Sequence, residues 1–166
     1  MNTPSYCVME FPNTVSPLLC DDIINLYNEK KGGVSVFIIP KKNKEWEKIE
    51  KYLYKQMLVK LTSYKTQLLY NLDNDYVFKL NSLLEKNVYC KDFFIQKYCP
   101  EYRKTYSRYN VLSFLFFLED TPPTTGGTIE PKKGKLLIFP EEPGFRCEFN
   151  YNDGRLILTG QLCGYM

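Results

Sequence analysis

Two stretches near the C-terminus decide the fold: PKKGKLLIFP at residues 131–140 and GRLILTG at residues 154–160. Each joins a glycine-containing turn to a short run of leucine, β-branched and aromatic residues, which is the pattern of a strand that begins at a turn. Other runs of this texture follow Cys90, separated by TPPTTGG, EEPG and NDG turn signals. Strands are therefore predicted over residues 93–98, 109–119, 135–140, 145–151 and 155–162.

The first half of the chain has a helical pattern instead. Ser16 and Pro17 suit an N-cap and a first helical position, and a glycine pair at 32–33 suits the end of that helix. Apolar residues recur at steps of three and four over 43–70 and again over 73–86, which predicts two more amphipathic helices. Short strands are predicted over residues 5–11 and 34–39. Helices followed by strands indicate an α+β fold, and 166 residues suit one domain, 1–166.

Composition excludes several classes of function. The sequence has no histidine, so a histidine-based catalytic triad or metal site is excluded. A net charge of +3 gives little reason to expect a polyanionic partner. No apolar segment is long enough to span a membrane, and the N-terminus does not resemble a signal peptide, so a cytoplasmic or nuclear location is expected. The six cysteines form no C-x-x-C pair and are expected to be reduced and mostly buried.

The order of these segments resembles that of the 2-oxoglutarate and Fe(II) dependent oxygenases, in the prolyl hydroxylase-like group. The matching stretches are QKYCP from Gln96, RYNVLSFLFFLE from Arg108, TGGT from Thr125, PKKGKLLIFP from Pro131 and GRLILTG from Gly154. The resemblance implies a double-stranded β-helix, or jelly roll, in the C-terminal half (90–166), buttressed by helical support from residues 1–89.

The resemblance also shows what the sequence lacks. The family holds Fe(II) with an H-x-D pair and a second histidine, and the position of that second histidine falls on Cys147, followed by Glu148. Only nine residues separate Tyr98 from Arg108, where the family carries H-x-D, and Glu101 is the one carboxylate among them. The resemblance therefore implies a degenerate form with no metal site and no cofactor.

Two positions match the family's co-substrate site. Arg155 stands where the closing strand carries the basic residue that pairs with the distal carboxylate of 2-oxoglutarate, and Tyr98 stands where prolyl hydroxylases place a tyrosine near it. The favoured interpretation is that Arg155 pairs with an acidic residue such as Glu130 or Glu148 and that Tyr98 belongs to the core.

The favoured hypothesis is a pseudoenzyme that binds a protein, such as a host prolyl hydroxylase or its substrate. The AT-rich coding bias, visible as abundant Lys, Asn, Tyr and Ile with no Ala, suits a viral or parasite modulator. One alternative is an active oxygenase that uses Cys147 with carboxylates as metal ligands. A weaker alternative is a nucleic-acid-binding module. Its candidate residues lie in two turns: Lys97, Arg103, Lys104, Arg108, Lys132, Lys133 and Lys135, with Tyr102, Tyr106 and Tyr109.

Overall fold

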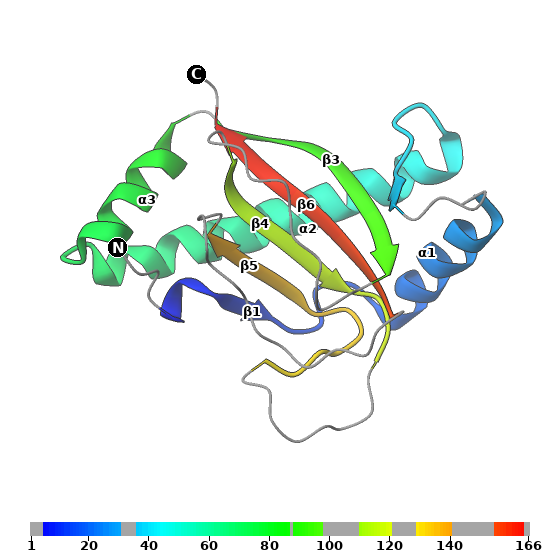
Figure 1. The fold of residues 1–166 in the computed structure, drawn as a ribbon, viewed down its shortest axis with the longest axis horizontal. Coiled ribbons are helices and arrows are strands. Elements are labelled where there is room, and N and C mark those ends of the chain that lie inside the picture. The colour runs from blue at the N-terminus through cyan, green and yellow to red at the C-terminus, as the bar shows by residue number, and fades with distance from the viewer. Residues whose placement is uncertain are drawn as a thin grey trace.

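The fold is an antiparallel sheet with helices on one face, seen in a computed structural model (Figure 1). The structure describes residues 5–30, 36–86, 88–97, 110–120, 129–140 and 155–164. The elements in chain order are the 3-10 helix η1 (Ser5–Cys7), β1 (Met9–Phe11), α1 (Pro17–Lys30), β2 (Val36–Ile38), α2 (Lys44–Leu68), the 3-10 helix η2 (Leu69–Asn71), α3 (Asp75–Glu85), β3 (Val88–Lys97), β4 (Asn110–Phe117), β5 (Leu136–Pro140) and β6 (Leu156–Gly164).

The six strands lie in the order β1-β5-β4-β6-β3-β2, and every neighbouring pair is antiparallel. The two shortest strands, β1 and β2, come from the first half of the chain and occupy the edges. The chain's last strand, β6, lies between β4 and β3, where Gly160 pairs with both Phe114 and Phe93. Strands that are not consecutive in the chain are therefore neighbours on both sides of β6, as in a jelly roll.

One face of the sheet packs against the helices and forms the main core. In Figure 1, α2 crosses behind the sheet, between α3 on one side and α1 on the other. Trp46, Leu53 and Met57 line the inward side of α2 and are fully buried in the same cluster as Phe114 and Leu158. The three-and-four spacing of the sequence therefore marks a helix face that packs against a sheet.

The opposite face of the sheet, which we call the second face, is also buried. Leu115 and Phe117 of β4, Leu137 of β5 and Ile157 of β6 form a separate apolar cluster with Ile129. Because both faces are covered, β4 reads as a nearly continuous apolar run rather than an alternating one. Burial on both faces fits the predicted jelly roll, whose further strand at 145–151 lies outside the described residues.

Two predicted boundaries were wrong. Residues 5–7 form the 3-10 helix η1 rather than the start of a strand, and β1 begins only at Met9. Strand β3 begins at Val88, five residues before the predicted start, because Val88–Cys90 pair with the end of β6. A register irregularity between Cys90 and Phe93 separates that extension from the rest of β3, and it breaks the alternation on which the sequence prediction depended.

Candidate ligand face of the sheet

A row of polar side chains crosses the second face. Gln96 of β3 lies opposite Ile157, and Ser113 of β4 lies opposite Gln161 of β6. Thr159 lies between them on β6, and alternation places all of these side chains on the face away from the helices. We call Gln96, Ser113, Thr159 and Gln161 the polar row.

Burial makes this row unusual. Gln96, Ser113 and Thr159 are at most 4% exposed, although they lie beside the apolar cluster of the second face. Polar groups at this depth are normally hydrogen-bonded, because an unmade bond costs about 1–3 kcal/mol. The Nε2 amide of Gln96 is buried and has no hydrogen-bond partner among the described residues. The second face therefore contains an unused donor.

Arg155 lies at the start of β6, next to this face. The backbone N–H of Leu156 donates to Glu119 Oε2 at 2.6 Å, which fixes the chain where Arg155 enters the strand. No carboxylate of the described residues lies within ion-pairing distance of Arg155. Glu130, one of the two carboxylates considered as its partner, instead lies 3.9 Å from Lys132 Nζ. A half-buried guanidinium of this kind suits a carboxylate ligand.

The other predicted site residues fall outside the described ranges. They are Tyr98, Glu101, Cys147 and Glu148. Within the described ranges, no three Asp, Glu or Cys side chains come together as candidate metal ligands. The whole sequence also lacks the imidazoles of a two-histidine-one-carboxylate iron site. The residues therefore do not fit the ferrous centre that the resemblance would imply.

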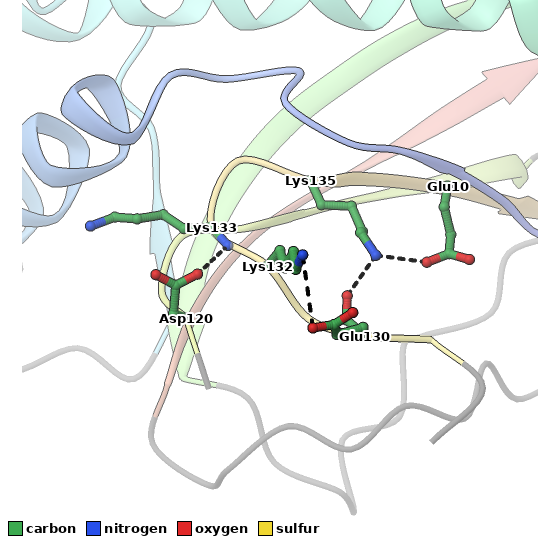
Figure 2. Close-up of polar contacts among 6 residues, drawn as sticks. All are labelled: Glu10, Asp120, Glu130, Lys132, Lys133 and Lys135. Carbon is green, nitrogen blue, oxygen red and sulfur yellow. Dashed lines mark hydrogen bonds and ion pairs between the residues drawn. The ribbon is translucent and has the colours of Figure 1, made fainter. Parts of the chain in front are cut away.

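Two of the three lysines of the 132–135 turn, Lys133 and Lys135, bind other groups of the chain. Lys135 Nζ donates to Glu10 Oε1 at 2.8 Å and to the Glu130 carbonyl at 2.6 Å, as Figure 2 shows. Lys133 forms an ion pair with Asp21, and its backbone N–H donates to Asp120 Oδ1 at 2.9 Å (Figure 2). Lysines paired with carboxylates contribute less to phosphate binding, so Lys133 and Lys135 do not support the nucleic-acid surface, whereas the side chain of Lys132 is 62% exposed. The other half, Arg103, Lys104, Arg108, Tyr102, Tyr106 and Tyr109, lies outside the described residues.

Four cysteines are described, all as free thiols, and three of them are buried, as the sequence predicted. Burial raises the pKa of Cys7 and of Cys20 to about 11, and that of Cys90 to about 12. These thiols are therefore protonated at neutral pH and are poor nucleophiles or metal ligands.

Sequence reasoning missed the polar row. Its residues stand inside runs that were assigned to strands as wholes, and Gln96 is the fourth residue of FFIQKY. Strand alternation alone would have placed Gln96 beside Phe94 on one face and Ile95 on the other. The pairing of β3 with β6, and of β6 with β4, could not be read from that pattern, and this pairing is what assembles the row.

Comparisons with known proteins support the fold. No protein-family model and no curated sequence matches the chain. Among solved structures, a viral collagen prolyl hydroxylase from Paramecium Bursaria Chlorella virus-1 is 16% identical, with a TM-score of 0.53 over 99% of this chain and 96% of that one. A prolyl-4-hydroxylase from Pseudomonas putida is 12% identical, with a TM-score of 0.57 over 96% and 93%. The chain therefore has the jelly-roll-like α+β fold of prolyl hydroxylases.

Proposed function

We propose that the chain is a prolyl-hydroxylase-like domain that does not catalyse oxygenation and acts by binding a partner protein. The observation that carries the proposal is the absence of histidine from a sequence with this fold. Dioxygen activation at a carbon–hydrogen bond needs a redox metal or organic cofactor, since side chains supply no equivalent chemistry. In this fold the metal is held by two imidazoles and a carboxylate, and the chain has no imidazole.

The second face supports the same proposal. The side chains of the polar row, Gln96, Ser113, Thr159 and Gln161, are neutral and bind ferrous ion weakly. Two carboxylates of neighbouring strand residues already accept hydrogen bonds. Glu119 accepts from Leu156 N, and Glu10 accepts from Lys135 Nζ. The second face is buried in the fold, but within the described ranges it offers no set of anionic ligands.

A partner fits the shape of the molecule. A domain shaped like a prolyl hydroxylase can compete with a true hydroxylase for a binding protein or for a substrate segment. We therefore propose a host prolyl hydroxylase or its substrate as the partner, with the chain as a viral or parasite modulator. Fold alone does not carry an activity, so the chemistry of the site and not the likeness is what the experiment must test.

The direct test is a metal and turnover assay. The protein is loaded with excess Fe(II) under anaerobic conditions, desalted and measured for iron, and then assayed for 2-oxoglutarate decarboxylation in air. We expect no stoichiometric iron and no turnover above that of free iron. Stoichiometric iron that is lost in Cys147→Ser, together with turnover, would instead establish the alternative oxygenase with Cys147 and carboxylate ligands.

A further inference from the structure

The solvent side of α2 carries an unusual concentration of apolar side chains. Tyr52, Tyr54, Leu58 and Val59 fall within eight consecutive residues, and each is between 38% and 52% exposed. The opposite side of the same helix already supplies the core with Trp46 and five other buried residues. Single exposed apolar residues are ordinary, whereas four on two turns of one helix form a patch.

This patch is also positively charged. Residues 51–72 contain four lysines and no acidic residue. Lys51 forms an ion pair with Glu47 at 3.1 Å, but the side chains three and four residues from Lys55 are Lys51, Tyr52, Leu58 and Val59. No carboxylate of the described residues lies within ion-pairing distance of Lys55. Lysines at i and i+4 repel each other, so Lys51 and Lys55 destabilise the helix slightly.

We infer that the α2 face, defined as Lys51, Tyr52, Tyr54, Lys55, Leu58 and Val59, binds an acidic amphipathic segment of a partner protein. A partner carboxylate placed at Lys55 would relieve the repulsion from Lys51. Apolar side chains of the segment would cover Tyr52, Leu58 and Val59, which flank Lys55 on the helix surface. The inference rests on the proposed function as a binding protein and names the surface and the chemistry of its partner.

The pattern favours a protein over two other anionic partners. A helix that lies on a membrane separates its apolar side from its charged side, but the apolar side of α2 is already buried in the core. Lysines and apolar residues instead alternate around the exposed side. Single-stranded nucleic acids stack on aromatic faces, which Tyr52 and Tyr54 offer, but the aliphatic Leu58 and Val59 that complete the apolar part of the face do not. Tyrosine is enriched at protein–protein interfaces, where a polar rim surrounds the apolar contacts.

The test uses fluorescence anisotropy with a labelled helical peptide of about three heptads, with leucine at positions a and d and glutamate at most others. The full chain should bind this peptide and not a matched peptide in which lysine replaces glutamate. Lys55→Glu should weaken binding about tenfold or more, because it turns attraction into repulsion. The same substitution adds a favourable neighbour for Lys51, so thermal stability should stay equal or rise.

Lys79→Glu on α3 is the matched control, since Lys79 is exposed and the change in net charge is identical. Equal weakening by Lys79→Glu would show general charge attraction and would overturn the inference, as would binding to single-stranded DNA or to phosphatidylserine vesicles that Lys55→Glu abolishes. Failure to bind the acidic peptide would also overturn it. The iron and turnover assay is independent of this surface, so the proposed function can survive that failure.

Discussion

Gly134, in the turn before β5, packs directly on the segment that joins β1 to α1. Its N–H donates to the Phe117 carbonyl at 2.8 Å, and its own carbonyl accepts from Thr14 N at 2.9 Å and Val15 N at 3.0 Å. Its φ of +88° lies in the left-handed region, and a Cβ at this position would overlap the Val15 carbonyl oxygen. Only glycine satisfies both constraints.

Gly134→Ala should therefore lower the free energy of unfolding by about 3 kcal/mol or more, from left-handed strain and backbone displacement together. Urea denaturation followed by circular dichroism measures the change. Lys132→Ala, in the same turn but with a side chain 62% exposed, serves as the control and should change stability by less than about 0.5 kcal/mol. Equal stability of the two variants would contradict the close packing of Gly134 on Val15.

The side chain of Lys135 also joins the N-terminal segment to the turn before β5. Its side chain is only 8% exposed, and it joins Glu10 of β1 to the carbonyl of Glu130. Lys135→Met keeps the aliphatic volume and removes both bonds, so we expect a loss of about 1.5–3 kcal/mol. A chemical denaturation midpoint close to that of the unmodified protein would show that hydrogen bonds to water replace both contacts without loss of stability.

At the scale of the element, the helices begin where short polar side chains cap them. The Ser16 hydroxyl accepts from Leu19 N at 3.2 Å, as its sequence position predicted. The Asn43 side chain accepts from Glu45 N and Trp46 N, and Asn74 does the same at the start of α3. These bonds use N–H groups that the helix itself cannot satisfy, so helix starts are encoded locally.

Asn43→Ala should destabilise the protein by about 1 kcal/mol, because it removes the acceptor at the start of α2, next to the buried Trp46. Asn43→Asp should keep most of the stability, since a carboxylate caps as well and suits the positive end of the helix. Thermal unfolding of the three proteins checks this order. A loss with Asp as large as that with Ala would contradict the capping role.

At the scale of the whole molecule, a sheet covered on both sides buries ionisable groups, and Cys7 and Cys20 are fully inaccessible. The pKa of a thiol in the unfolded chain is about 8.5, whereas burial in the fold raises the pKa of Cys7 and of Cys20 to about 11. Between these values the unfolded state releases protons that the folded state keeps. The contribution of these thiols to the free energy of unfolding should therefore be fully present below about pH 8.5 and be lost as the pH rises toward 11.

Each such thiol contributes a slope of up to about 1.4 kcal/mol per pH unit in that window. Urea denaturation at stepped pH values measures the slope. Cys20→Ala should make it shallower by one thiol's share, whatever its effect at neutral pH. An unchanged slope would mean that Cys20 ionises equally in both states, contrary to its burial.

The sequence alone predicts the helices and most strands, because caps, turns and apolar spacing act between residues close in the chain. It also determined that no imidazole is present to bind iron. The position of β6 between β4 and β3 emerges only in the fold, where it brings Gln96, Thr159 and Ser113 into one buried row. The fold also pairs Lys133 with Asp21 and Lys135 with Glu10. These contacts depend on pairing between segments that are distant in the chain. Burial on both faces of the sheet stabilises that pairing, and it produces no periodic pattern in the sequence.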